Sequence, residues 1–333
     1  MGIGIIFISH RLDEITDIAD RVTILRDGQL VRTMDVKDTN TVEIARLMVG
    51  RNVAIDRTHS DKRHISEEVM LSAKNLRVGM PGEIVRGVDI EVCKGEIIGI
   101  GGLAGQGKLG IANGIMGTYP ADGEVMFNGN RLELNSPHSA IKSGIAFVSE
   151  DRKGVGLLLD ESIELNIVFT AMQTNESFLK KFAGLSTKND REIREHVERM
   201  IKDLDIRCKS PLQNTGALSG GNQQKVCVAR ALTQKPQFLF VSEPTRGIDV
   251  GAKKLILDLL LKLNEEYGMT IVMTSSELAE MRSICDKIVI ICQGTVAGVL
   301  PPDASDADFG LMMSGSRIRT GADVTDKEVG AND

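Results

Sequence analysis

The stretch from Leu218 to Val226, which reads LSGGNQQKV, constrains the fold of this chain more than any other stretch does. A Ser-Gly-Gly turn that runs into a helix leaves backbone N–H groups uncovered at the positive end of the helix dipole. Glycine also lets a ligand approach the backbone closely. The stretch therefore predicts a helix whose N-terminus can bind an anion such as a phosphate.

A second stretch, residues 102–108, fits the spacing G-x-x-x-x-G-K of a phosphate-binding loop. The apolar run at 96–101 predicts a strand before it, and residues 109–116 predict a helix after it. A phosphate loop needs this context, because its N–H groups must converge on the β-phosphate while the lysine reaches the β- and γ-phosphates. The predicted phosphate-binding residues are Gly102, Gly105, Gln106, Gly107 and Lys108.

A third stretch begins with the apolar run at 237–241 and continues as SEPTRGID from Ser242 to Asp249. From about residue 70 to residue 314, short apolar runs alternate with helical stretches. That alternation is typical of an α/β fold with a largely parallel core sheet.

Taken in this order, the three stretches resemble the nucleotide-binding cassette of an ABC transporter. The runs GNQQK at 221–225 and EPTRGIDVGAK at 243–253 are similar to the second cassette of tandem ATP-binding subunits that drive bacterial uptake of sugars of the ribose, galactose or xylose type. The resemblance implies an α/β P-loop NTPase cassette with a mostly parallel core sheet and an antiparallel β part. It also implies a helical subdomain, which we expect at residues 154–205.

An internal repeat indicates how the domains are arranged. Residues 4–31 realign without a gap on residues 270–297, pairing Leu12 with Leu278 and Gly28 with Gly294. Each copy is predicted to form a short buried strand, an amphipathic helix, a second strand and a glycine turn. Because the second copy ends a complete cassette, we expect a chain shortened at its N-terminus. The expected parts are a C-terminal remnant of a first cassette at 1–50, a linker at 51–68, the second cassette at 69–315 and a disordered tail at 316–333.

Two positions depart from the family's pattern around the metal ion. The residue after the loop lysine should carry a hydroxyl group that binds Mg²⁺, but it is Leu109, whose side chain has no oxygen. The aspartate that normally ends the 237–241 strand and contacts the metal is replaced by Ser242. We therefore expect ATP as the cofactor, weak or absent Mg²⁺ binding with no protein metal ligand, and slow or no hydrolysis at this site.

The resemblance also implies catalytic roles for three residues. Glu243 corresponds to the residue that polarises the attacking water, and Glu150 stands where most cassettes have a glutamine that contacts the metal and the water. His10, in the first copy of the repeat, takes the position of the switch histidine that contacts the γ-phosphate. Its counterpart in the second copy is Ser276.

In ABC ATPases, two cassettes sandwich two nucleotides head to tail, and each signature turn caps the ATP that the other cassette holds. The resemblance implies this nucleotide contact for Ser219, Gly220, Gly221 and Gln223. It implies that Asp249 lies at the interface and aligns the opposite site. The implied partners are a second cassette in the same or another chain, transmembrane permease subunits and, indirectly, a sugar-binding protein. The implied location is the cytoplasmic face of the cell membrane, as a peripheral subunit.

Composition narrows the remaining function classes. Only 3% of the residues are aromatic and the formal net charge is −6, which together argue against a nucleic-acid surface. No run approaches the roughly 18–20 apolar residues that span a bilayer. Three alternatives stay open: a non-catalytic regulatory or docking cassette, a non-functional gene fragment, and a P-loop ATPase unrelated to transport, which leaves the signature helix unexplained.

Overall fold

The structure is a computed structural model that describes residues 4–8, 12–26, 29–40, 43–44, 47, 65–182, 185–248 and 250–315. His10 and Asp249 lie outside the described residues, as do most of the predicted linker and the whole predicted tail at 316–333. The expectations for these positions therefore stay predictions.

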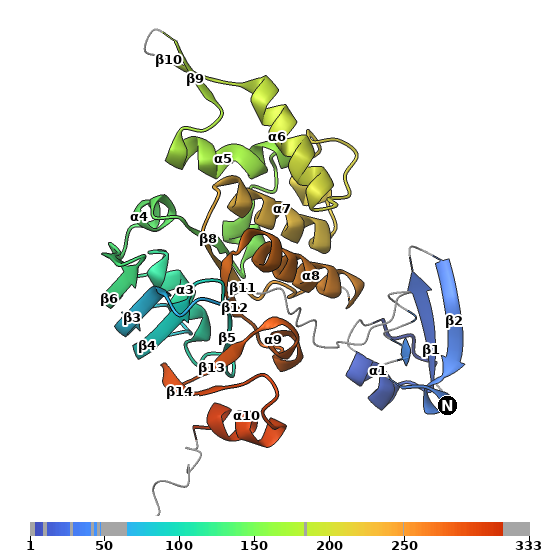
Figure 1. The fold of residues 1–333 in the computed structure, drawn as a ribbon. Coiled ribbons are helices and arrows are strands. Elements are labelled where there is room, and N and C mark those ends of the chain that lie inside the picture. Colours follow the sequence, from blue (N-terminus) through green and yellow to red (C-terminus); the bar gives the residue numbers. More distant parts are fainter. Residues whose placement is uncertain are drawn as a thin grey trace, which may run out of the picture.

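A six-stranded sheet, with strand order β14-β13-β5-β12-β11-β8, forms the centre of the cassette (Figure 1). Its strands are β5 (Ile97–Gly101), β8 (Ile145–Val148), β11 (Phe238–Ser242), β12 (Thr270–Thr274), β13 (Lys287–Cys292) and β14 (Thr295–Leu300). All pairs are parallel except β13 with the edge strand β14. Every residue of β5, β11 and β12 is buried, which explains their unbroken apolar sequences. The predicted largely parallel core sheet is confirmed.

Two apolar cores lie on opposite faces of this sheet, and β11 contributes to both. Phe238 and Phe240 pack on one face, while Leu239 and Val241 pack on the other. This follows from the two-residue period of a strand, which sends successive side chains to opposite faces. The sheet is therefore covered on both sides.

The first face is covered by an antiparallel sheet and two helices, which confirms the predicted antiparallel part. The strands, in the order β4-β3-β6-β7, are β3 (Val69–Val78), β4 (Val85–Cys93), β6 (Ala121–Phe127) and β7 (Asn130–Arg131). The helices are α3 (Lys108–Ile115) and α4 (Pro137–Lys142). Phe127 of β6 meets Phe238 of β11 edge to face, with ring centroids 5.8 Å apart, so the two sheets share one core.

Helices cover the other face and extend beyond it. They are α5 (Ile163–Asn175), α6 (Asp190–Asp203), α7 (Gly220–Thr233), α8 (Val250–Tyr267), α9 (Leu278–Ile284) and α10 (Asp306–Met313), with a π-helical turn η2 (Arg152–Gly156) and a 3₁₀ turn η3 (Thr215–Ala217). A hairpin of β9 (Leu179–Phe182) and β10 (Leu185–Lys188) links α5 to α6 at the far end (Figure 1). The helical subdomain expected at 154–205 is confirmed. None of the described helices combines the length and apolar character needed to cross a membrane.

The N-terminal segment repeats the end of the cassette. It consists of α1 (Leu12–Ile18), β1 (Arg21–Arg26), β2 (Gln29–Asp35) and the 3₁₀ turn η1 (Val36–Asp38). Helix, strand and strand follow one another as in α9, β13 and β14, and the first residues of the elements keep the constant offset of the sequence repeat. A small core formed by Ile15, Val22, Ile24 and Ile44 holds the segment together.

One prediction for this segment is wrong. The sequence predicts a buried strand at residues 4–8, but they form no strand, and Ile6 and Ile8 are more than 90% exposed. The corresponding strand of the second copy, β12, is buried between β5 and β11. An apolar run becomes a buried parallel strand only where neighbouring strands pair with it, and no described residue pairs with 4–8.

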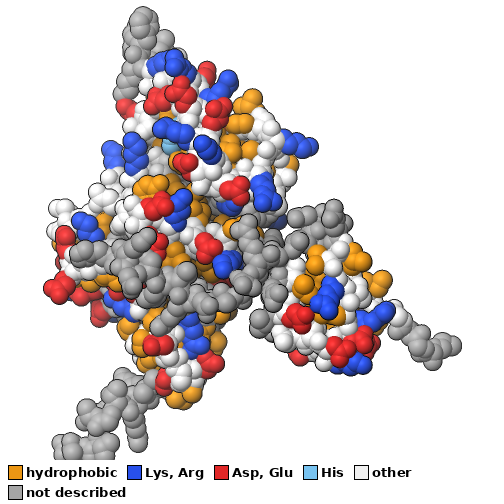
Figure 2. Space-filling model, turned by 45° about the vertical axis from the view of Figure 1, so that its right-hand side comes forward, with side chains coloured by type: hydrophobic (Ala, Val, Ile, Leu, Met, Phe, Trp, Pro, Cys, Tyr) orange, Lys and Arg blue, Asp and Glu red, His pale blue; other side chains and the backbone are white. Residues whose placement is uncertain are grey.

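The surface carries charges of both signs. Figure 2 shows basic and acidic side chains interspersed over the face that it presents. Neither sign therefore dominates that face.

His196 predicts a pH dependence of stability. Its Nε2 lies 2.9 Å from Thr233 Oγ1, and its ring lies against Phe178. Burial, together with the nearby charges of Arg199 and Lys235, lowers the pKa of His196 below its ordinary value of 6.5. Below about pH 6.5, His196 therefore binds a proton more readily in the unfolded chain than in the folded chain. The contribution of neutral His196 to the free energy of unfolding is fully present above about pH 6.5 and falls as the pH drops below that value.

We expect the urea midpoint of the parent to fall more between pH 7.5 and pH 5.5 than the midpoint of His196→Gln, which cannot titrate. All other titrating groups are common to the two proteins, so the difference isolates His196. Equal losses in the two proteins would contradict this assignment.

Candidate functional site

The loop between β5 and α3 has a backbone that glycine alone can adopt at key points. Gly102, Gly105 and Gly107 have φ angles of +145°, +76° and +99°. A Cβ on Gly102 would lie 2.4 Å from the carbonyl oxygen of Ile291, and a Cβ on Gly107 would lie 2.6 Å from that of Ile84. The loop therefore packs closely against the backbone of Ile291 and Ile84. It leads directly into the N-terminus of α3, which is the strand, loop and helix order that the sequence predicts.

Lys108, Ser276 and Glu243 come together at the carboxyl edge of the sheet. The Lys108 side chain is 2% exposed, and its Nζ donates to the carbonyl of Gly102 at 3.0 Å and to Ser276 Oγ at 2.7 Å. Ser276 Oγ donates in turn to Glu243 Oε1 at 2.6 Å, which lies 3.5 Å from Lys108 Nζ. The three residues follow β5, β12 and β11, whose parallel alignment places their carboxyl ends side by side.

Glu243 adopts a backbone conformation that is uncommon for a non-glycine residue. Its φ angle is +47°, and its N–H donates to the carbonyl of Thr274 at 2.7 Å. Left-handed residues of this kind cost free energy and concentrate at functional sites. The conformation holds the Glu243 carboxylate toward Lys108 and Ser276.

Glu83 belongs to no motif of the sequence, yet it lies at the centre of the loop. It comes from the turn between β3 and β4 and is 8% exposed. Its Oε1 accepts from the N–H of Gly105 at 2.8 Å, and its Oε2 accepts from the N–H groups of Gly107 at 2.8 Å and Leu109 at 3.3 Å. The Glu83 carboxylate thus accepts hydrogen bonds from the N–H groups of Gly105 and Gly107, which the sequence predicts to bind a phosphate.

Gln106 joins the loop to the turn between β13 and β14. Its Oε1 accepts from the N–H of Gln293 at 2.6 Å, and its carbonyl accepts from the N–H of Gly294 at 2.8 Å. The Gln106 side chain therefore holds the phosphate loop against the turn between β13 and β14. A nucleotide contact by Gln106 stays a prediction.

Glu150 is connected to the first turn of α3 through a buried asparagine. Asn113 Nδ2 donates to Glu150 Oε1 at 3.2 Å and to the carbonyl of Leu109 at 3.0 Å. This places the carboxylate of Glu150 beside the helix that follows the phosphate loop. Asn113 was not singled out from the sequence, because it belongs to no motif.

The two positions at which the family contacts the metal ion are occupied by Leu109 and Ser242. Leu109 has an alkyl side chain, and Ser242 is fully buried at the end of β11. Ser242 Oγ and Thr274 Oγ1, which belong to residues paired in register on neighbouring strands, have no hydrogen-bond partner. Within the described ranges, no group of three or more His, Cys, Asp or Glu side chains could hold a metal ion.

The signature turn lies at the N-terminus of α7, where Ser219 is exposed and Gly220 and Gly221 are half-buried. Ser219 is the N-cap residue, and its Oγ accepts from Asn222 Nδ2 at 3.0 Å. Gly220 and Gly221 follow in the first turn of the helix. Helix α7 lies with α5 and α8, whereas α3 lies beside the antiparallel strands (Figure 1). In the described part of the chain, no hydrogen bond joins this turn to residues 102–108.

Gln223 has an internal role in the structure. The side chain is 7% exposed, and its Nε2 donates to the carbonyl of Leu218 at 3.2 Å. It therefore fixes the backbone just before the signature turn. The expected nucleotide contact of Gln223 stays a prediction.

Arg152, for which the sequence predicts no contact, links the signature turn to two other loops. From η2, its Nη1 donates to the carbonyl of Gly220 at 2.7 Å and its Nη2 donates to that of Arg246 at 3.1 Å. One guanidinium thus connects the loop after β8, the signature turn and the turn after β11. Its planar fork is suited to two such contacts at once.

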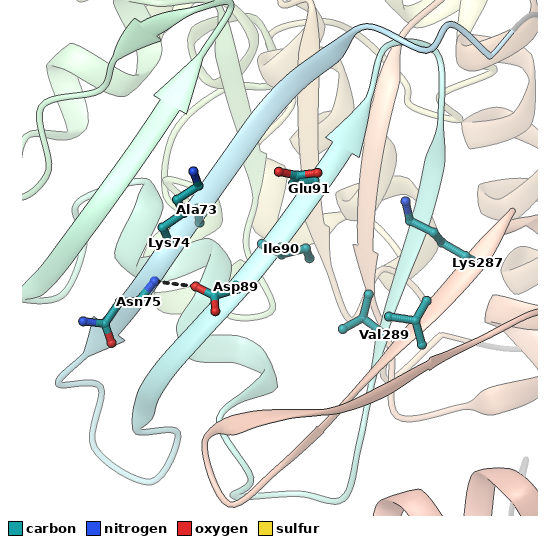
Figure 3. A pocket seen from close by; sticks show the side chains of 9 residues that line it. Ala73, Lys74, Asn75, Asp89, Ile90, Glu91, Lys287 and Val289 are labelled. Atoms are coloured by element: carbon teal, nitrogen blue, oxygen red, sulfur yellow. Dashed lines mark hydrogen bonds between the residues drawn. The ribbon is translucent and has the colours of Figure 1, made fainter. Parts of the chain in front are cut away.

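A separate surface pocket lies between β3, β4 and the β13–β14 hairpin (Figure 3). Lys74, Asp89 and Lys287 line it beside the apolar side chains of Ile90 and Val289, and Asp89 Oδ1 accepts from the backbone N–H of Asn75 at 2.6 Å. It shares no residue with the phosphate loop or the signature turn. The candidate site therefore consists of these two motifs and the residues around them.

Comparison with known proteins agrees with the geometry. Residues 85–246 match the family model described as ABC transporter. The chain is 38% identical over 308 residues to a ribose import ATP-binding protein RbsA of Bacillus cereus and 38% identical over 313 residues to the xylose import ATP-binding protein XylG of Thermoanaerobacter pseudethanolicus. Each match covers 92% of this chain and 60% of the relative, so the chain spans less than two thirds of their length.

Solved structures show the same fold. The dimeric post-hydrolysis state of the ATP-binding cassette MJ0796, bound to ADP and Pi, matches with a TM-score of 0.59 and 24% identity over 71% of this chain and 100% of that one. The ATP-binding cassette MJ1267 matches with a TM-score of 0.60 and 22% identity over 75% and 96% of the two chains.

Proposed function

We propose that this chain is an ATP-binding, energy-coupling subunit of a carbohydrate importer of the ABC transporter family, whose model matches residues 85–246. Support comes from the relatives named as ribose and xylose import ATP-binding proteins, which share 38% of their aligned residues with this chain. Sugar import belongs to the proposal, because the chain spans only 60% of each relative.

The proposed role of the cassette is to lend its signature turn to a phosphate loop on a second cassette, in the same or another chain. The observation that carries this proposal is the turn of exposed Ser219 and half-buried Gly220 and Gly221 at the N-terminus of α7, which makes no hydrogen bond to the described phosphate loop of its own chain. Backbone N–H groups at such a helix end can stabilise charge on a transferring phosphoryl group. Gln223 and Arg152 would hold the turn in place through their hydrogen bonds to the carbonyl groups of Leu218 and Gly220.

The chain's own site is proposed to hydrolyse ATP slowly or not at all. Leu109 lacks the hydroxyl and Ser242 lacks the carboxylate that would hold Mg²⁺ at these two positions. Mg²⁺ neutralises charge during phosphoryl transfer. Glu243 and Glu150 keep their carboxylates near the loop. Without a metal ligand beside them, we infer that these two residues do not support full catalysis.

The proposed partners follow from this arrangement. They are a second cassette, membrane permease subunits and, indirectly, a sugar-binding protein, and the proposed place is peripheral, on the cytoplasmic face of the membrane. We propose residues 69–315 as the cassette. We further propose residues 1–50 as a segment of another cassette, which the matching order of α1, β1 and β2 with α9, β13 and β14 supports.

A non-catalytic regulatory cassette is the second candidate. Leu109, Ser242 and Ser276 favour it, because each lacks the group that supports hydrolysis at the corresponding position of the family. In that case the chain would dock on an intact cassette without contributing to its rate. The two candidates therefore differ in whether the signature turn affects hydrolysis at the partner's site.

The metal argument can be tested by restoring both groups with the double substitution Leu109→Thr and Ser242→Asp. We expect the double variant to bind Mn²⁺–ADP more tightly than the parent, measured as the loss of the electron paramagnetic resonance signal of Mn²⁺–ADP free in solution. Mg²⁺-dependent ATP hydrolysis should rise in the same variant. Leu109→Thr alone is the control, because it lacks the carboxylate. A parent that binds Mn²⁺–ADP as well as the double variant would contradict the argument.

A further inference from the structure

The turn between β3 and β4 brings a charged group into the phosphate loop from outside every recognised motif. We propose that Glu83 is an internal competitor of the nucleotide, whose carboxylate must leave the loop before phosphates can enter. The inference rests on the proposed role of residues 102–108 as a phosphate site. It goes beyond that role by naming the residue that controls access to the site.

The contacts of Glu83 are those of a bound anion. Its two oxygens accept from the N–H groups of Gly105 and Gly107 at 2.8 Å each, and from that of Leu109 at 3.3 Å. These donors lie at the positive end of α3, where a carboxylate and a phosphate are stabilised by the same dipole. Because each N–H serves one strong acceptor at a time, the carboxylate and a phosphate group exclude each other.

The ammonium group of Lys108 also has its contacts within the chain. Lys108 Nζ is bonded to Ser276 Oγ and to the carbonyl of Gly102, and it lies 3.5 Å from the Glu243 carboxylate. The phosphate site is thus neutralised by two internal carboxylates, Glu83 on the backbone donors and Glu243 beside the lysine. A nucleotide must displace the first of them to reach the loop.

The backbone of Glu83 is packed tightly against the loop and α3. A Cβ on Gly110 would lie 2.3 Å from the carbonyl oxygen of Glu83, and the carbonyl of Ile84 packs against Gly107. The N–H of Glu83 donates to the carbonyl of Met80 at 3.0 Å, which closes the turn. This packing aims the carboxylate at the loop instead of leaving it free in solvent.

The test is a titration of the full chain by calorimetry, with ATP and with inorganic tripolyphosphate as probes. If the carboxylate occupies the loop about nine-tenths of the time, its removal makes binding about tenfold tighter. We therefore expect Glu83→Ala to bind both probes about tenfold more tightly than the parent. Glu83→Gln, which keeps the size of the side chain but loses its charge, should bind both probes more tightly than the parent.

The matched control is Glu91→Ala, which removes an exposed carboxylate from β4 and should bind both probes as the parent does. Glu83→Gln also keeps the test decisive if Glu83→Ala folds poorly. Affinities of Glu83→Ala and Glu83→Gln that equal the parent's, or are weaker, would overturn the competition while leaving the phosphate site in place. Absence of binding of both probes to every variant would overturn the phosphate site itself, and the competition with it. Tighter binding of tripolyphosphate alone would support the competition and contradict ATP as the ligand.

Discussion

Replacing Gly221 by Asp is expected to lower ATP hydrolysis about 10²–10³-fold when this cassette is paired with one whose phosphate loop is complete, because the exchange disables the donors that stabilise the transferring phosphoryl group. A Cβ on Gly221 would lie 3.0 Å from that of Ala252 in α8, so the turn or α8 must give way by a few tenths of an ångström. The added carboxylate would also repel the nucleotide's phosphates.

The measurement uses a graft, in which residues 69–315 replace the matching part of the Bacillus cereus ribose import ATP-binding protein. Hydrolysis by the purified graft is compared with and without the substitution. Gly310→Asp is the matched control, because it adds the same charge at an exposed position in α10 where a Cβ meets nothing within 4 Å. Equal rates of ATP hydrolysis for Gly221→Asp and Gly310→Asp would favour a regulatory cassette over one whose signature turn supports hydrolysis at the partner's site.

Replacing Asn166 by Leu is expected to lower the free energy of unfolding by about 3 kcal/mol, because it leaves the N–H of Leu158 and the buried hydroxyl of Thr215 without the partner that Asn166 gives them. Asn166 is fully buried in α5. Its Nδ2 donates to the carbonyls of Leu158 and Ser162 and to Thr215 Oγ1, and its Oδ1 accepts from the N–H of Leu158, all within 3.0 Å. Leucine has a similar volume, so the loss reports the hydrogen bonds and not a cavity.

This effect bears on function, since Thr215 lies in η3, directly before the signature turn. Urea unfolding measures the change. Asn175→Leu is the control, because Asn175 ends the same helix and is exposed, and surface exchanges of this kind usually stay within about 0.5 kcal/mol. Unfolding of the two variants at the same urea concentration would contradict the account of Asn166.

The central sheet could be predicted from the sequence because strands buried on both faces have continuous apolar sequences bounded by loop residues. Residues 97–101 and 238–242 are of this kind. The same reasoning failed at residues 4–8, which align with β12 in the repeat and are also largely apolar. Composition specifies what can be buried, but only a neighbouring strand buries it.

The site was predictable to the extent that motifs fall on consecutive residues. The spacing of residues 102–108 placed Lys108 correctly after a strand, and the third stretch placed Glu243 directly after β11. Glu83 and Arg152 reach the motifs from other turns, through contacts that only the packing of the two sheets and the helices creates. Glu83 belongs to no motif, and nothing in the sequence shows which carbonyl groups the Arg152 side chain contacts.

The central claim is an asymmetry: the cassette serves a partner's nucleotide with its signature turn and has a deficient site of its own. The most direct test compares two substitutions in the graft. Gly221→Asp disables the turn, and Lys108→Ala disables the loop. The account predicts that Gly221→Asp nearly abolishes ATP hydrolysis while Lys108→Ala leaves most of it. Loss of hydrolysis with Lys108→Ala, together with retention in Gly221→Asp, would contradict the claim.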